Sequence, residues 1–201
     1  MIGSRPDPDG WGGEVLFETE RLVLRTFRRE DLERAAAINA DPEVMRYLGG
    51  PLSREVTEER MLDANAAVRA GRTAMQAVER RDDGAFLGMV GLSVVPWYPD
   101  QLQLGWRLAP AHHGQGYATE AAERWLAHGF EDVGRTEIHA MADVPNRASI
   151  SVMERLGMRW VHDAAPVDGD EEFRASLYVI TVAEWQTSRR RCPPPGFGGL
   201  T

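Results

Sequence analysis

The chain has 201 residues, of which 43% are hydrophobic and 27% are charged, and its formal net charge at pH 7 is −8. This size and composition are typical of one soluble globular domain. The acidic balance argues against a nucleic-acid-binding domain, which usually has a basic surplus, and no apolar run approaches the length of a membrane span. A single cysteine excludes an internal disulfide framework. With no apolar segment near its start to act as a secretion signal, the protein is expected in the cytoplasm.

Residue periodicity predicts a mixed order of strands and helices. Strand alternation is found in Leu22–Arg25, Thr73–Arg80, Phe86–Val95, Leu102–Leu108, Thr136–Ala142, Met158–His162 and Phe173–Val182. Helical spacing is found in Asp31–Asn39, Pro42–Leu48, a segment between a Ser53 cap and Gly71, Ala118–Phe130 and Asn146–Leu156. Because there is no long alternation of strand and helix, the order predicts an α+β mixed sheet.

Both ends of the chain are predicted to lie outside the folded domain. Met1–Gly13 is rich in glycine, proline and aspartate, which predicts a disordered leader. Residues 188–201, with Arg189–Arg191 beside prolines, are predicted to form a disordered tail. The domain is therefore expected to span residues 14–187. Cys192 lies in the tail, where a spare thiol is the favoured interpretation over a nucleophile.

The stretch Leu102–Phe130 changes from strand to helical spacing at a loop with two glycines, Gly114 and Gly116. Glycine lets backbone N–H groups approach a ligand, and the first turn of a helix has unpaired N–H groups at its positive end. This order suits a phosphate or pyrophosphate, although a glycine pair before a helix is often only a tight turn. The P-loop motif is absent, and Thr119 stands where a dinucleotide fingerprint has its third glycine.

The run GQGYATE at Gly114–Glu120 resembles the GNAT superfamily of N-acetyltransferases, and within it the Rim-type branch that acetylates ribosomal-protein N-terminal alanines. Further segments resemble the branch in the same order: ERLVLRT at Glu20–Thr26, GMVG at Gly88–Gly91, LGWRLAP at Leu104–Pro110, DVPNRASISVMERLG at Asp143–Gly157 and LYVITVAEW at Leu177–Trp185. The resemblance implies a largely antiparallel mixed sheet of about seven strands, with splayed central strands 4 and 5 and about four flanking helices.

The resemblance also implies where acetyl-CoA binds. Loop N–H groups would hold its pyrophosphate, the backbone of one strand segment would bond the thioester carbonyl and the pantetheine arm, and Asn146 would bond that arm as well as capping a helix. His113 stands where the family prefers Gln or Arg. The implied cofactor-binding residues are Trp106, Arg107, Leu108, His113, Gly114, Gln115, Gly116, Tyr117, Ala118, Thr119, Asn146 and Ser149. No metal is expected.

Acetyl transfer to an amine requires a neutral amine, a stabilised oxyanion and a leaving thiolate. Ser149 is implied as the catalytic acid for the thiolate, with a plain first-turn serine as the alternative. Gln103 stands where many relatives have a glutamate base, and glutamine cannot take a proton. Asp100, His112 and His139 are conceivable bases, with plainer interpretations as turn, loop and strand-surface residues, and a water chain is a further alternative.

These residues favour an acetyl-CoA-dependent N-acetyltransferase that acts on a primary amine by direct attack in a ternary complex. Without a strong base, an α-amine with a pKa of about 7.8 is neutral far more often than a lysine amine at about 10.4, so protein N-termini, amino acids and other small amines are favoured. Gln103 supports the alternative, a non-catalytic acyl-CoA-binding or regulatory module. Glu120 and Glu123 are expected to be exposed. We expect no nucleic-acid or membrane partner, and a homodimer is compatible with the fold.

Overall fold

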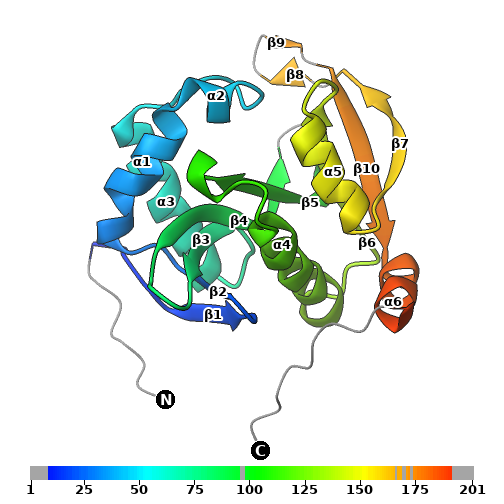
Figure 1. Cartoon of the computed structure of the whole chain (residues 1–201), viewed down its shortest axis with the longest axis horizontal. Coiled ribbons are helices and arrows are strands. Elements are labelled where there is room, and N and C mark those ends of the chain that lie inside the picture. The colour runs from blue at the N-terminus through cyan, green and yellow to red at the C-terminus, as the bar shows by residue number, and fades with distance from the viewer. Residues whose placement is uncertain (1–8, 96–97, 166, 169–170, 173, 192–201) are drawn as a thin grey trace, which may run out of the picture. The chain divides into compact units, whose positions relative to one another are not determined.

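The computed structural model describes residues 9–95, 98–165, 167–168, 171–172 and 174–191. The strands are β1 (Val15–Glu18), β2 (Leu22–Arg25), β3 (Met75–Arg80), β4 (Phe86–Val95), β5 (Tyr98–Leu108), β6 (Glu137–Asp143), β7 (Arg159–Ala164), β8 (Val167–Asp168), β9 (Glu171–Glu172) and β10 (Ala175–Thr181). Eight of them form one sheet in the order β1-β2-β3-β4-β5-β6-β10-β7, and β8 and β9 form a separate pair. Figure 1 labels these elements along the chain.

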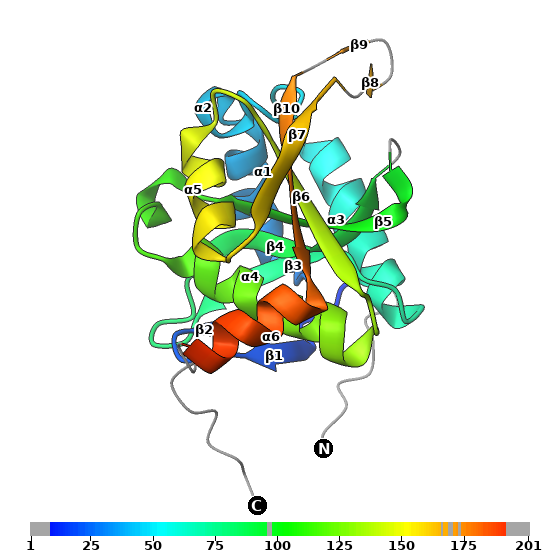
Figure 2. The same ribbon diagram turned by 90° about the vertical axis from the view of Figure 1, so that its right-hand side faces the viewer.

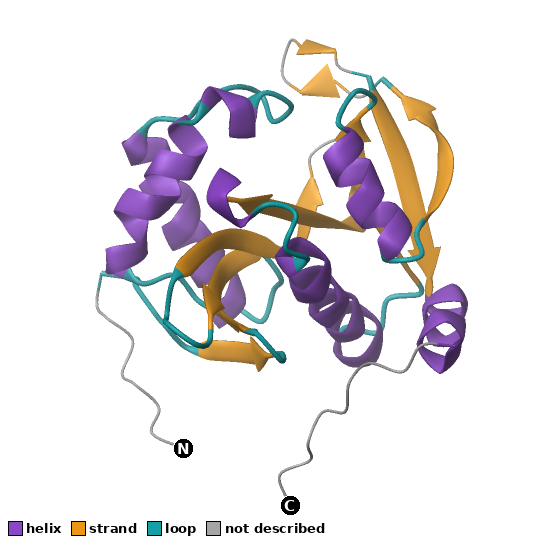
Figure 3. Ribbon diagram, in the orientation of Figure 1, coloured by secondary structure: helices purple, strands orange, loops and turns teal. Residues whose placement is uncertain are grey.

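The helices complete the α+β fold that the sequence predicts (Figure 3). The α-helices are α1 (Leu32–Ala40), α2 (Pro42–Met45), α3 (Arg54–Arg69), α4 (Tyr117–Ala127), α5 (Arg147–Arg155) and α6 (Val182–Arg191). Shorter turns are η1 (Arg29–Asp31), η2 (Pro110–His112) and the π-type η3 (His128–Asp132). Within the described residues, no helix has the length and apolar character needed to cross a membrane.

Strand pairing confirms the predicted mixed, largely antiparallel sheet. β1–β2, β2–β3, β3–β4, β6–β10 and β10–β7 are antiparallel, whereas β5 and β6 are parallel and are paired through Gln103 and His139. Among the described residues, β5 and β6 pair through this one residue pair, which fits the predicted splay of these two central strands. The sheet has one strand more than the sequence predicts, because the edge strand β1 lacks the clear alternation of its neighbours.

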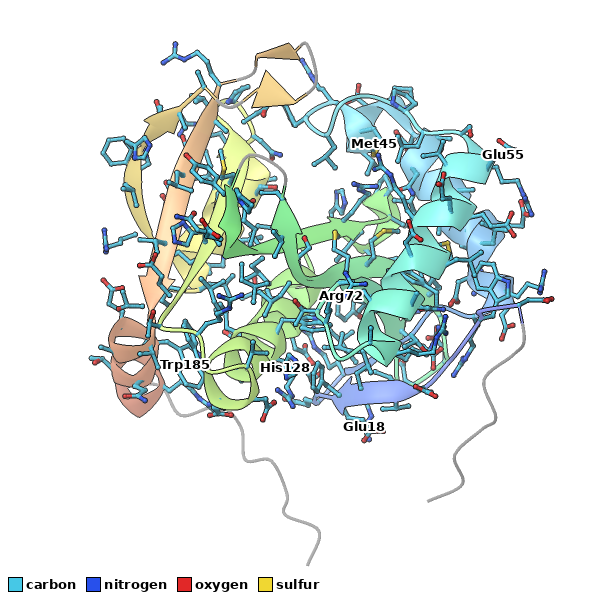
Figure 4. The ribbon with its side chains drawn as sticks, turned by 180° about the vertical axis from the view of Figure 1, so that it is seen from behind. Glu18, Met45, Glu55, Arg72, His128 and Trp185 are labelled. Atoms are coloured by element: carbon cyan, nitrogen blue, oxygen red, sulfur yellow. The ribbon has the colours of Figure 1, made fainter. Side chains whose placement is uncertain are left out.

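The chain divides into two compact units, Met1–Ser93 with Gly105–Ala122, and Val94–Leu104 with Glu123–Thr201. The core of the first unit is formed by buried apolar side chains of Trp11, Phe27, Leu32, Ala35, Ile38, Met61, Ala77, Phe86 and Met89. Met45 of α2 is also fully buried (Figure 4). In the same unit the Ser53 hydroxyl accepts a hydrogen bond from Val56 N, so its predicted role as the cap of α3 is confirmed.

The prediction of a disordered leader over residues 1–13 is wrong for residues 9–13. Trp11 is only 3% exposed, and the neighbouring Gly12 N–H donates to the Phe27 carbonyl at 2.9 Å. Burial of a large aromatic side chain stabilises this segment despite a local composition typical of disorder. Residues 1–8 lie outside the described part of the chain.

In the second unit, β10 lies between β6 and β7 and continues into α6 (Figure 2). Helix α6 was not predicted, although its start has a capping-box sequence. The Glu184 carboxylate accepts hydrogen bonds from the Thr181 N–H at 2.8 Å and the Thr181 hydroxyl at 2.7 Å. The predicted domain boundary at residue 187 therefore falls inside a helix that reaches Arg191, while Cys192 lies outside the described residues.

Candidate active site

The glycine loop joins β5 and η2 to the first turn of α4, in the first unit. Gly114 and Gly116 have φ values of +72° and +82°, a region that residues with a Cβ rarely adopt. No described residue accepts a backbone hydrogen bond from the N–H groups of residues 114–119, and the first helical bond runs from Glu120 N to Gly116 O at 3.0 Å. The loop therefore presents a run of unpaired donors at a helix N-terminus, an arrangement that can bind an anion.

Arg21, directly before β2, holds this loop in place. Its Nε lies 2.6 Å from the Glu120 carboxylate, and its Nη1 donates to the Gln115 carbonyl at 3.0 Å. Its guanidinium also lies over the Tyr117 ring, 4.7 Å from the centroid. The Thr19 hydroxyl donates to the same Glu120 carboxylate at 2.6 Å. The structure thus fixes the loop through side chains that lie about a hundred residues earlier in the sequence.

One sequence prediction about the loop region is corrected, and one residue that supports the loop is new. Glu120 was expected to be exposed, but its side chain is 17% exposed because Arg21 and Thr19 cover it, whereas Glu123 is exposed as expected. The sequence analysis assigns no role to Arg21, although this residue lies in the ERLVLRT segment. The segment's alternation indicated a strand, but nothing local indicated how far the Arg21 side chain reaches.

The strand before the loop is closely packed against β4. A Cβ on Gly88 would lie 2.2 Å from the Arg107 carbonyl oxygen, so only glycine permits this approach of the two strands. Leu108 is buried, and its carbonyl accepts a hydrogen bond from His113 Nε2 at 2.9 Å. The His113 ring therefore connects the loop to the end of β5, while Trp106 is half-buried.

The Arg107 side chain makes contacts that the sequence did not predict. Its Nη1 donates to Asn39 Oδ1 of α1 at 2.5 Å, while its Nε is buried and has no hydrogen-bond partner among the described residues. Burial, and to a lesser extent the positive charge of Arg60, lowers the pKa of Arg107 to about 10. The first unit therefore contains a cation whose charge is only partly satisfied.

Asn146 and Ser149 belong to the second unit. Asn146 Oδ1 accepts a hydrogen bond from Ser149 N at 3.1 Å, which confirms Asn146 as the cap of α5. The Asn146 Nδ2 group makes no hydrogen bond with a described residue and is available as a donor. The Ser149 side chain is half-buried, and its hydroxyl likewise makes no hydrogen bond within the described part of the chain.

Among the candidate bases, His139 has the most suitable surroundings. Its Nε2 lies 2.9 Å from a Glu137 carboxylate oxygen, which can only accept, so Nε2 carries the proton and the buried Nδ1 is an acceptor with no partner among the described residues. The predicted strand-surface position is wrong, since His139 is 6% exposed. Asp100 is exposed, and burial followed by the charge of Arg80 lowers the pKa of the half-buried His112.

Gln103 is also buried, opposite His139 in the pairing of β5 with β6. Its Nε2 lies 3.5 Å from the Met141 sulfur. The residue at the position of the usual glutamate therefore contacts a thioether sulfur, and glutamine itself cannot take a proton.

The fold and the glycine loop agree with what a comparison with known families finds. A family model described as an acetyltransferase (GNAT) domain matches residues 21–159, which is more than half of the chain. The protein is therefore an acetyltransferase. The chain belongs to the GNAT family, as the sequence resemblance implied.

Relatives and solved structures support the same assignment. The uncharacterized protein YkkB of Bacillus subtilis is 31% identical over 148 residues, which cover 71% of this chain and 84% of that protein. The FsC-acetyl coenzyme A-N(2)-transacetylase of Aspergillus fumigatus is 29% identical over 184 residues, covering 84% and 77%. The structure of a GNAT-family acetyltransferase from Bacillus anthracis is similar with a TM-score of 0.70 and 26% identity, covering 82% of this chain and 96% of that one.

Proposed function

We propose that this GNAT acetyltransferase moves an acetyl group from acetyl-CoA to a primary amine, by direct attack in a ternary complex. The observation that carries the proposal is the run of unpaired N–H groups of residues 114–119 at the start of α4. Such donors fit the pyrophosphate of the coenzyme, and Arg21 fixes them in advance. The name of the A. fumigatus relative, which includes acetyl coenzyme A, supports the same co-substrate.

The remaining binding roles follow from groups with open hydrogen-bonding capacity. Asn146 uses Oδ1 to cap α5, and its Nδ2 is free to donate to the pantetheine arm. The backbone of Trp106, Arg107 and Leu108 supplies donors and acceptors along the same arm, and a backbone N–H there stabilises the oxyanion. The five motif segments in order support assignment of the chain to the Rim-type branch of the family.

Acetyl-CoA, when bound, supplies a thioester whose C–S bond breaks as the amine forms its N–C bond. His139 takes the proton that the amine loses, because its Nδ1 is an acceptor and Glu137 holds the ring from the other side. The Ser149 hydroxyl donates its proton to the leaving thiolate and takes a replacement proton from solvent, which the half-buried side chain reaches. The buried Gln103 takes no part in proton transfer. An α-amine is still the easier acceptor, because a larger fraction of it is neutral at pH 7 than of a lysine amine.

A second candidate function is a non-catalytic acyl-CoA-binding module, which Gln103 favours because glutamine cannot take a proton. The two functions separate in one experiment that measures both acetyl-CoA binding by calorimetry and thiol release with a panel of amines. The panel contains peptides with different first residues, amino acids, polyamines and aminoglycosides. Acceptor-dependent thiol release supports acetyl transfer. Binding without release from any acceptor supports the module, and loss of both contradicts the coenzyme assignment itself.

A further inference from the structure

A chain of hydrogen bonds in the first unit holds the Arg107 guanidinium in a fixed place. Arg107 Nη1 donates to Asn39 Oδ1 at 2.5 Å, and Asn39 Nδ2 donates to the Thr57 hydroxyl at 3.1 Å. The Thr57 hydroxyl donates in turn to the Ser53 carbonyl at 2.9 Å. Asn39 and Thr57 are 3% and 0% exposed, so the orientation of the Asn39 amide is set by buried partners. These contacts position the Arg107 side chain, which reaches from β5 to α1.

The positive charge at the end of this chain of hydrogen bonds is not neutralised. Arg107 makes no ion pair with any described residue, its hydrogen-bond partner is a neutral amide, and its Nε has no partner in the described part of the chain. Arg60, an exposed residue of α3, is close enough to add repulsion and likewise forms no ion pair there. Arg107 is half-buried and its Nε is fully buried, and a partly desolvated cation without an anionic partner costs stability.

Arg25, a buried arginine of the same unit, shows how an arginine with a purely structural role is paired. Arg25 is 2% exposed, and its guanidinium lies 2.6 Å from Asp31 and 2.8 Å from Glu79. The sequence around Arg107 provides no such acid, although Asn39 stands at hydrogen-bonding distance and is isosteric with aspartate. The missing anion is thus expected from outside the chain.

We propose that Arg107 binds a carboxylate of the acceptor, so that the acceptor is an amino acid or a similar amine that carries a carboxylate. The proposal rests on the acetyl-transfer function proposed above and specifies its substrate class. The guanidinium fork matches a carboxylate in shape and charge. The two neighbouring cations, Arg107 and Arg60, repel polyamines and favour an acceptor with a negative group. The pyrophosphate of the coenzyme is provided for separately, by the backbone N–H groups of residues 114–119.

The test compares each common L-amino acid with its own carboxamide as acceptor in a thiol-release assay. The carboxamide lacks the carboxylate, and its amine is more often neutral, so amine reactivity alone favours the carboxamide. We expect the wild-type protein to prefer the best amino acid over its carboxamide by about tenfold or more in kcat/KM. Equal rates for the pair, or a preference for the carboxamide, would overturn the proposal and leave acetyl transfer standing.

A binding measurement tests the same preference without turnover. Calorimetry with N-acetylated amino acids and their N-acetylated carboxamides is expected to show tighter binding of the carboxylate form. If that preference is found while no amine releases thiol, the carboxylate site is supported and the proposed acetyl transfer fails. If neither form binds and no amino acid is acetylated, the carboxylate site is refuted.

Two variants assign the preference to the guanidinium. Arg107→Gln removes the charge, and Asn39→Asp provides an internal carboxylate in nearly the same volume, so both are expected to reduce the preference to about twofold or less. Arg60→Gln serves as the matched control, because it removes a nearby exposed cation and is expected to keep most of the preference. An unchanged preference in both Arg107→Gln and Asn39→Asp, with weaker CoA binding, would assign Arg107 to a coenzyme phosphate and refute the proposal.

Discussion

Arg25 and Arg107 lie in the same compact unit, and their surroundings differ in one respect. Burial alone would lower the pKa of Arg25, but Asp31 and Glu79 outweigh it, so the pKa is raised. At Arg107, burial and Arg60 act in the same direction, and the pKa falls to about 10. The charge of Arg25 is neutralised by two carboxylates of its own chain. Arg107 has no carboxylate partner among the described residues, which is typical of a group that binds a ligand.

Breaking the completed pair has the largest expected effect. Asp31→Asn leaves Arg25 buried without its bidentate partner, so the free energy of unfolding should fall by about 3–5 kcal/mol, measured by urea denaturation. Glu33→Gln, which removes one of the two carboxylates that pair with the exposed Arg54, is the control and should change stability little. A loss at Asp31 no larger than that of the control would remove the contrast between the two arginines.

The second unit offers a similar incomplete group in His139. If His139 is the base, His139→Gln should lower kcat/KM by about 10²-fold while acetyl-CoA binding is kept. The wild-type pH profile of kcat/KM should rise with an inflection that stays in place when the acceptor is changed. An inflection that follows the pKa of each acceptor amine would indicate that no enzyme group removes the proton.

In the proposed coenzyme site the glycine loop binds through backbone N–H groups, so its affinity should be sensitive to the shape of the loop. Gly116→Val puts a β-branched side chain at φ +82°, with its Cβ 3.4 Å from the Arg21 guanidinium. Acetyl-CoA binding measured by calorimetry should weaken by about tenfold or more. Gly134→Val, at a positive φ outside the loop, is the control for general strain. A folded Gly116 variant that binds like wild type would contradict the proposed pyrophosphate site.

Asn39→Asp gives Arg107 a carboxylate partner of the kind that Arg25 has in Asp31. The new carboxylate should pair with Arg107 and raise the free energy of unfolding at pH 7 by about 1 kcal/mol. Pairing depresses the folded-state pKa of the aspartate, so the gain is present above the unfolded value of about 3.9 and is lost as the pH falls through the folded value. A gain that persists at low pH would show that the charge pair is not its cause.

Asn146→Ala is expected to lower the free energy of unfolding by about 1 kcal/mol, because α5 loses its cap. If Asn146 Nδ2 also binds the pantetheine arm, the KM for acetyl-CoA should rise in the same variant. A lower melting temperature with an unchanged KM would assign Asn146 to capping alone. Ser53→Ala, which removes the cap of α3, is the matched control.

Local patterns in the sequence predicted the elements whose causes are local. The bounds of β4, Phe86–Val95, agree with the predicted range, and the caps at Ser53 and Asn146 are present as expected. Each depends on alternation or on a side chain within a few residues. The capping box at Thr181 and Glu184 is an equally local signal, so the sequence also contained the information needed to predict α6.

The candidate site was predicted less completely, because its supports connect distant residues. Arg21 and Glu120 are 99 positions apart, and Asn39 and Arg107 are 68 apart. The resemblance identified the loop and the strand backbone but gave no information on the partners of these side chains. The burial of Trp11 is a similar case, since its neighbours lie on helices and strands much later in the chain.

The brace that Arg21 places on the loop limits how the protein can be shortened. A fragment that begins at β3 would keep every residue from His113 to Glu120, and therefore the whole recognisable motif. It would lack both Arg21 and Thr19, which together hold Glu120, Gln115 and Tyr117. A library of fragments screened for the motif alone would retain such fragments. Their glycine loop would be intact in sequence, but without Arg21 and Thr19 to hold it the fragments are expected to lose coenzyme affinity.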